Sequence, residues 1–164
     1  MRVSSVAVAA ALTLACLSAS LQSQRPDDQI DPRSTALLVR GRAAETAGNL
    51  QLATDLLESA VAVDPRNRAG FKALAEVADR VGLPGKAIRL YREALLLEPN
   101  DVDALRGQGE ALVRKGAVNR ARDNLVKLRT LCRGACPEAT QLAATIAKGP
   151  PIATAQATVP PPKE

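Results

Sequence analysis

Aromatic residues and histidine are the scarcest components of this sequence. Its 164 residues include one Phe, one Tyr, no Trp and no His. Strands favour aromatic and β-branched residues, whereas the apolar 46% of this chain is mostly Ala, Leu and Val, and the first two favour helices. The composition therefore predicts an all-α fold in one domain of ordinary size. The lack of His removes the most common general acid or base, so we expect no enzymatic activity.

Signatures for phosphate and nucleotide binding are incomplete. Residues 82–87 contain a Gly-Lys pair, but Arg80 stands where a phosphate-binding loop requires its first Gly. Gly107 and Gly109 lack the third Gly of a dinucleotide-binding fingerprint. We therefore expect no cofactor.

The charge is distributed rather than clustered. The chain has 22 basic and 17 acidic residues, a formal net charge of +5, and the two signs are interspersed. Nucleic-acid-binding proteins gather Lys and Arg on one face and often add stacking aromatic residues. Neither feature is visible here, so we expect no nucleic-acid partner.

The first twenty residues have the layout of a secretory signal peptide. Arg2 is followed by an apolar run, residues 6–17, and then by small residues that permit cleavage after Ser20. The run is about half of the roughly 20 residues that a spanning helix needs, which favours cleavage over an uncleaved anchor. Residues 13–16, TLAC, faintly resemble the lipobox of bacterial lipoproteins, so acylation of Cys16 is the alternative. Either route predicts an exported protein, periplasmic or lipid-anchored to the bacterial envelope.

Two cysteines remain once Cys16 is set aside. Cys132 and Cys136 flank a short segment that contains Gly134, which favours a turn. A close pair in an oxidising compartment predicts a structural disulfide. No His or further Cys is available to complete a four-ligand zinc site, and C-x-x-x-C differs from the C-x-x-C of redox sites. We therefore expect a disulfide and no metal.

One amphipathic segment occurs twice at a fixed distance. Residues 87–101, AIRLYREALLLEPND, repeat the pattern of residues 53–67, ATDLLESAVAVDPRN, without a gap. The matched positions include Pro65 and Pro99, which lie 34 residues apart. A fixed period of this length is typical of repeat architectures.

The spacing of apolar residues predicts seven helices separated by Gly and Pro. Asp31 can cap the first helix, with Pro32 at its first position. Six of the helices pair as three hairpins, and the seventh shows one apolar side that can cover the last hairpin. We expect the hairpins at about residues 34–67, 68–101 and 102–133, and the capping helix at 137–148.

The flanking segments differ from this 32–148 domain in composition. Residues 21–31 are polar and predict a flexible leader. Residues 149–164 contain five Pro and no amphipathic pattern, which predicts an extended, disordered tail.

The repeated unit resembles the tetratricopeptide repeat. The middle copy carries most of the family pattern: Phe71, Leu74, Ala75, Gly82, Ala87, Tyr91, Ala94 and Pro99. The outer copies match less well. Arg40 and Gln108 occupy positions that are usually apolar, and Arg133 replaces the closing Pro of the third copy. The resemblance implies an all-α solenoid of stacked helical hairpins; an unrelated three-hairpin bundle is the alternative.

The resemblance also implies a binding surface. In this family the first helices of the hairpins line a concave groove that takes an extended peptide or a partner helix. Its residues here would be Leu38, Arg42, Glu45, Lys72, Glu76, Asp79, Arg106, Glu110 and Arg114. Some family members hold a C-terminal carboxylate with a Lys-Asn pair, but Leu38 and Arg42 stand at those positions in the first copy. All carboxylates are expected on exposed faces.

These observations predict a non-enzymatic adaptor or assembly factor with a protein or peptide partner. Ordinary solvated helix surface is the simpler interpretation of each groove residue by itself. The alternatives are a small-ligand or lipid-handling accessory protein, which would need a cavity between groove and cap, and a self-assembling protein whose end hairpins stack between copies.

Overall fold

The computed structural model describes residues 29–132 and 134–151 of the chain. The predicted signal peptide with Cys16, most of the leader, Arg133 and most of the Pro-rich tail lie outside these residues. The described part contains helices and no strand. None of its helices is both long enough and apolar enough to cross a bilayer.

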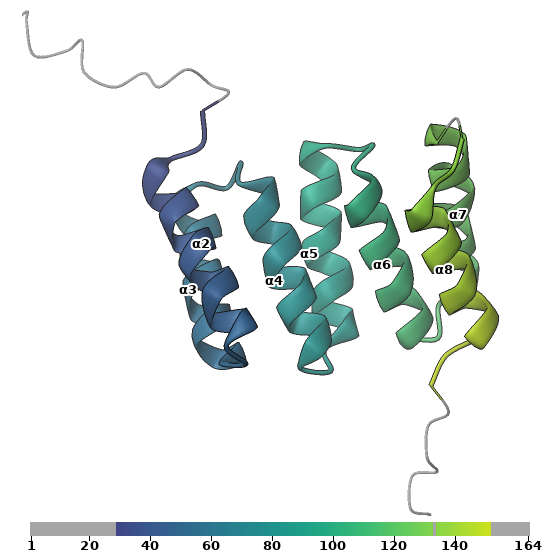
Figure 1. Ribbon diagram of the computed structural model, residues 1–164, viewed down its shortest axis with the longest axis horizontal. Helices are drawn as coiled ribbons and strands as arrows, with labels where there is room; N and C mark the ends of the chain where they lie inside the picture. Colours follow the sequence, from purple (N-terminus) through teal and green to yellow (C-terminus); the bar gives the residue numbers. More distant parts are fainter. Residues whose placement is uncertain (1–28, 133, 152–164) are drawn as a thin grey trace, which may run out of the picture.

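The helices stack as two rows (Figure 1). α2, α4, α6 and α8 form one row, and α3, α5 and α7 form the second row behind it. The prediction of an all-α helical-hairpin solenoid with a C-terminal capping helix is confirmed. The helices are α2 (Pro32–Thr46), α3 (Leu50–Val63), α4 (Arg68–Arg80), α5 (Pro84–Leu97), α6 (Val102–Arg114), α7 (Val118–Leu131) and α8 (Pro137–Lys148).

The first helix of each hairpin begins with the same device. The side chains of Asp31, Asn67 and Asp101 accept hydrogen bonds from backbone N–H groups in the first turns of α2, α4 and α6. A free N–H group at a helix start needs such a partner, and a side-chain oxygen at the N-cap supplies it. The expected cap at Asp31, with Pro32 following it, is present.

Each first helix also ends in the same way. Gly48, Gly82 and Gly116 have φ values of 79°, 78° and 82°, a left-handed conformation that a side chain disfavours. The chain then reverses, and the residue after each glycine donates to a carbonyl five residues back. These bonds run from Asn49 to Ala44, from Leu83 to Ala78 and from Ala117 to Leu112.

Small residues set the distance between helices. A Cβ atom built on Gly41 would lie 2.6 Å from Cγ of Leu57, and one on Gly109 would lie 2.6 Å from a methyl carbon of Leu142. Both leucines are completely buried. The alanines at the equivalent position of each second helix are fully buried as well: Ala53, Ala87 and Ala121. Helices can approach this closely only where side chains are absent or small.

α8 continues the repeat rather than merely covering its end. Its buried or partly buried residues lie 34 positions after those of α6: Ala139, Leu142, Ala143 and Ile146 follow Leu105, Gln108, Gly109 and Leu112. It packs against both α6 and α7, and it occupies the next place in the front row. The capping helix α8 thus packs on the third hairpin as the first helix of each later hairpin packs on the one before it.

Tyr91 and Gly107 form a pair of complementary sizes. Tyr91 occupies the α5 position that Leu57 and Leu125 occupy in α3 and α7, and its ring is buried beneath α6. A Cβ atom on Gly107 would overlap several atoms of this ring. The larger residue at 91 is thus accommodated by the missing side chain at 107.

We expect Gly107→Ala to destabilise the protein by about 1–3 kcal/mol, because the ring is held in a packed core and cannot move away cheaply. Gly85→Ala is the matched control, since a Cβ there meets nothing within 4 Å and Ala favours helix by up to about 1 kcal/mol. Tyr91→Leu should partly rescue Gly107→Ala. Urea unfolding of the unmodified protein, Gly107→Ala, Tyr91→Leu and the double variant gives the coupling free energy between the two positions. Additive changes in the free energy of unfolding would contradict the proposed contact.

Candidate peptide-binding face

The predicted groove residues lie on the front row of helices. Leu38, Arg42 and Glu45 come from α2, the next three from α4, and the last three from α6. We call this surface, together with the partners described below, the first-helix face. Its nine predicted residues comprise four cations, four carboxylates and Leu38, so their formal charges cancel.

Ion pairs join α2 to α4 across the face. Arg42 contacts Glu76, and it also lies 3.2 Å from Glu45 on its own helix. Arg80 reaches back to Glu45 at 3.2 Å. Glu45 is buried and receives both cations, so the structure places it at the centre of this cluster.

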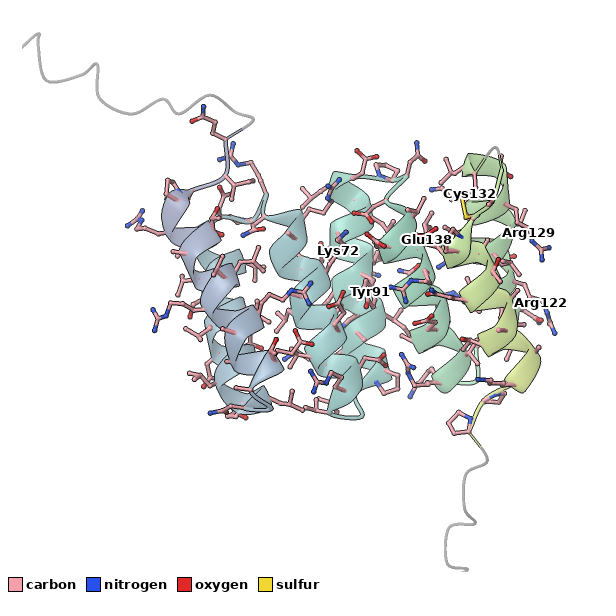
Figure 2. The ribbon with its side chains drawn as sticks, viewed as in Figure 1. Lys72, Tyr91, Arg122, Arg129, Cys132 and Glu138 are labelled. Carbon is pink, nitrogen blue, oxygen red and sulfur yellow. A yellow bond between two sulfur atoms is a disulfide. The ribbon has the colours of Figure 1, made fainter. Side chains whose placement is uncertain are left out.

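The same kind of contact joins α4 to α6. Asp79 pairs with Arg114. Lys72 lies 3.0 Å from a carboxylate oxygen of Asp101 and 3.3 Å from one of Asp103 (Figure 2 labels Lys72). The sequence analysis missed the partners Arg80, Asp101 and Asp103. The repeat period was the available signal, because Arg42–Glu76, Glu45–Arg80 and Asp79–Arg114 join residues 34 or 35 positions apart.

Arg106 and Glu110 make the one pair on this face that stays within α6, at 3.1 Å. Both keep part of their side chains exposed, 27% and 20% respectively. Leu38 takes no part in the ion pairs; it is partly buried and packs against the core cluster that contains Leu57 and Leu74. The structure thus brings eight of the nine predicted residues into charge pairs and places Leu38 at the edge of the core.

Tyr91 lies beneath the charged face. Its phenol projects from α5 between α4 and α6 (Figure 2). Burial raises its pKa, and the nearby carboxylates of Glu76 and Glu110 raise it further, against the opposing effect of Arg106. Tyr91 therefore remains a neutral hydroxyl at physiological pH.

The expectation that every carboxylate is exposed is wrong. Asp31, Glu45, Asp64 and Asp101 are all buried. Each one has donors that a helical pattern does not reveal, because they come from caps and from neighbouring repeats. Asp64, for example, accepts the backbone N–H of Asp31 at 2.8 Å.

This contact belongs to a buried polar network at the first hairpin junction. The hydroxyl of Ser34, which is fully buried, donates to the carbonyl of Ala60 at 2.7 Å. The side-chain amide of Asn67 donates to the Ser34 oxygen at 2.7 Å. These bonds connect α2, α3 and the start of α4, so polar groups as well as apolar ones fix the first hairpin against the second.

Two of the buried carboxylates have lowered pKa values. The guanidinium of Arg66, with backbone N–H groups of Asp31 and Arg66, lowers the pKa of Asp64 from 3.8 to about 2. Burial alone would raise the pKa of Asp101, but the Ala104 N–H, Lys72 and Arg68 outweigh it and lower the pKa. Both groups therefore favour the folded state when they are ionised.

Cys132 and Cys136 lie at the turn from α7 to α8. Their Cα atoms are 5.8 Å apart, within the usual range for a disulfide, and the sulfurs are placed at bonding distance. A cavity of about 450 Å³ opens beside them. A second, of about 250 Å³, is lined by parts of α3, α4 and α5 and the α4–α5 turn. Neither of these two cavities includes a residue of the predicted groove.

Comparison with known proteins identifies the fold. A tetratricopeptide repeat family model matches residues 72–127. No curated protein matches the chain. The stacked hairpins thus have the tetratricopeptide-repeat fold, and the family pattern is matched over residues 72–127.

Solved structures with the same fold include several tetratricopeptide domains. The Sgt2 domain from Aspergillus fumigatus is 20% identical, with a TM-score of 0.67, and the match covers 76% of this chain and 83% of that chain. The first such domain of Spaghetti (RPAP3), bound to an HSP90 peptide, is 19% identical, with a TM-score of 0.65 and coverage of 71% and 91%. The TPR2B domain of yeast Sti1, in complex with pHsp70, is 17% identical, with a TM-score of 0.66 and coverage of 71% and 97%.

The lowered carboxylate pKa values predict acid sensitivity. The stabilisation from Asp64 should be complete above about pH 4 and should disappear as the pH falls towards 2, because the unfolded chain binds the proton first. Asp64→Asn should therefore unfold with a weaker dependence on pH between 4 and 2. Asp123→Asn, at an exposed position on α7, is the control and should leave the profile unchanged. Thermal melting at several pH values measures both, and equal profiles for Asp64→Asn and the unmodified protein would contradict the assignment.

Proposed function

We propose that this protein is a non-enzymatic adaptor or assembly factor of the bacterial cell envelope, which binds a peptide or a partner helix on the first-helix face. The observation that carries the proposal is the continuous face that α2, α4 and α6 present, with charged side chains on consecutive helices. The solved structures of like fold in complex with an HSP90 peptide and with pHsp70 support a peptide or protein ligand, although they share less than a quarter of their residues with this chain.

The charge pattern of the face indicates what kind of peptide fits. Its cations already have carboxylate partners, so an acidic peptide must displace Glu76, Asp79 or Glu110 to reach them. A ligand with both charges can exchange these pairs one for one, at little net cost for exposed pairs. We therefore favour a mixed-charge segment over one that is recognised by its C-terminal carboxylate.

Two other functions have less support in the structure. A small-ligand or lipid-handling role would need a cavity between the groove and the capping helix. The larger cavity borders α8, but it lies on the α7 side and includes no residue of the predicted groove. Self-assembly would occur through the ends of the solenoid, not through the first-helix face. The position at which crosslinks form distinguishes partner binding on the first-helix face from self-assembly.

A photoreactive amino acid at position 110 should capture the partner in envelope extract, because Glu110 is partly exposed on the face. The matched control is position 122, where Arg122 is exposed on α7 and donates a hydrogen bond to Asn119. The double variant with Arg106→Glu and Glu110→Arg is then tested as a competitor of the unmodified protein, and we expect it not to bind the partner. Its free energy of unfolding should change by less than about 1 kcal/mol, because the pair within α6 is preserved.

Equal capture at positions 110 and 122 would contradict a specific face, and so would full competition by the swapped variant. Crosslinks between two copies of this chain at position 122 but not at 110 would instead support self-assembly.

Export and the disulfide form the second part of the proposal. The apolar run at residues 6–17 supports export, and the 5.8 Å separation of the Cys132 and Cys136 Cα atoms supports their oxidation in the envelope. The bond closes a short loop, so the chain-entropy model gives it a stabilising effect of only about 2 kcal/mol. Its structural effect is to hold the start of α8 beside the end of α7.

We expect thiol labelling of the denatured, unreduced envelope protein to find Cys132 and Cys136 unreactive. Its amino terminus should lie between residues 16 and 26. A free amine at Leu21 indicates secretion with cleavage after Ser20, and an acylated Cys16 indicates a lipoprotein. Two labelled thiols would contradict the disulfide, and an intact Met1 would contradict both export routes.

A further inference from the structure

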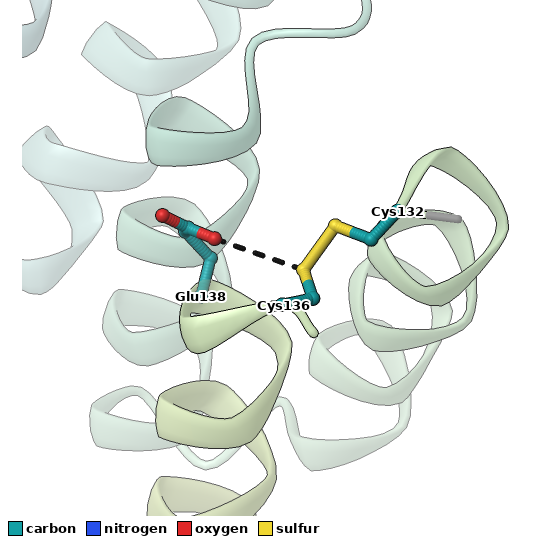
Figure 3. Close-up of side chains that lie close together, drawn as sticks. All are labelled: Cys132, Cys136 and Glu138. Carbon is teal, nitrogen blue, oxygen red and sulfur yellow. Dashed lines mark hydrogen bonds between the residues drawn. A yellow bond between two sulfur atoms is a disulfide. The ribbon is translucent and has the colours of Figure 1, made fainter. Parts of the chain in front are cut away.

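The turn between α7 and α8 gathers three metal-binding side chains. Cys132 is the C-cap of α7, Cys136 is the N-cap of α8, and Glu138 lies in the first turn of α8. The two sulfurs and a carboxylate oxygen of Glu138 all lie within 4.8 Å of one another. Figure 3 shows Glu138 directed at Cys136, with 3.7 Å between its oxygen and the Cys136 sulfur. No other group of three His, Cys, Asp or Glu side chains is this close within residues 29–132 and 134–151.

This cluster is open to solvent. Both cysteines line the cavity of about 450 Å³, together with Arg129, Gly134 and Thr140. Cys132 and Glu138 are partly exposed, and Cys136 lies on the wall of the cavity. An ion can therefore reach the sulfurs without unfolding either helix.

We propose that the reduced form of this cluster binds one Cu(I) ion through the thiolates of Cys132 and Cys136, with the Glu138 carboxylate beside it. A dithiol reductant supplies two electrons to the disulfide and is itself oxidised to a disulfide. The two thiols then lose two protons as the ion binds, which leaves a bis-thiolate complex. The disulfide and the metal site are thus alternative states of the same pair.

The ligand set favours copper over zinc. Thiolates are soft ligands, which suit Cu(I), and two of them are enough to bind this ion. Structural zinc takes four ligands, and the described surroundings add only one carboxylate to the two sulfurs. The Glu138 carboxylate lies in the first turn of α8, so the proposed site requires no distant segment of the chain.

Electrostatics at this place favours the two thiolates that would hold the ion. The start of α8 carries partial positive charge, which stabilises a thiolate at Cys136. The carboxylate of Glu138 opposes a second negative charge nearby until a cation arrives between them. Arg129, on the cavity wall, adds positive charge on the α7 side (Figure 2).

The test uses the full chain with Cys16→Ser, so that only the two cysteines of the turn remain. The reduced protein is titrated with Cu(I) in the absence of oxygen, in competition with the chelator bathocuproine disulfonate. We expect one ion per chain, and no binding after oxidation to the disulfide. Cys132→Ser and Cys136→Ser should each weaken binding by more than about 100-fold, beyond what the loss of an outer-shell partner costs.

Glu138→Gln keeps both thiols and should weaken binding by about 10-fold. The control is Asp123→Asn, a carboxylate change at an exposed position on α7 that should leave the Cu(I) affinity unchanged. Circular dichroism of each variant confirms that the helices are intact. Equal Cu(I) binding by the Cys132→Ser, Cys136→Ser double variant, or equal binding by the oxidised protein, would overturn the proposal.

Discussion

Close contact between helices is the constraint on which the rest of this structure depends. Gly41, Gly107 and Gly109 have no side chain at the points where Leu57, Tyr91 and Leu142 press against them. A single hairpin buries too little apolar surface to offset the entropy of ordering it, so each unit is stable only against its neighbours. Because the packing brings the first helices side by side, side chains one period apart can form ion pairs. The candidate binding face is therefore a product of the core packing.

Much of the architecture could be predicted from the sequence, because it rests on local signals. The 34-residue period, the glycine after each first helix and the caps at Asp31 and Asp101 are visible in the residues themselves. The position of α8 in the front row could also be predicted, because its apolar residues follow the 34-residue period. The sequence favours a capping role for α8, because the residues after it show no second helix in register.

The candidate face was harder to predict because its contacts lie between repeats. The helical pattern placed Arg42 and Glu76 on the correct side, but it did not show that they meet. The burial of Glu45 was missed, since a carboxylate on a helix is normally solvated and only its two arginine partners explain its position. A search for opposite charges one period apart would have found these pairs. The size complementarity of Tyr91 and Gly107 could have been found in the same way.

The distribution of ion pairs gives the two rows of helices different mechanical properties. Cross-helix pairs such as Arg42–Glu76, Asp79–Arg114 and Lys72–Asp103 lie along the front row. In the described part of the back row, one such pair, Lys86–Glu58, joins consecutive second helices. Salt screens exposed charge pairs over about 8 Å at physiological ionic strength but leaves apolar contacts intact. Salt should therefore weaken the contacts between front-row helices more than those between back-row helices. The stiffness of the front row, and with it the curvature of the solenoid, should vary with ionic strength.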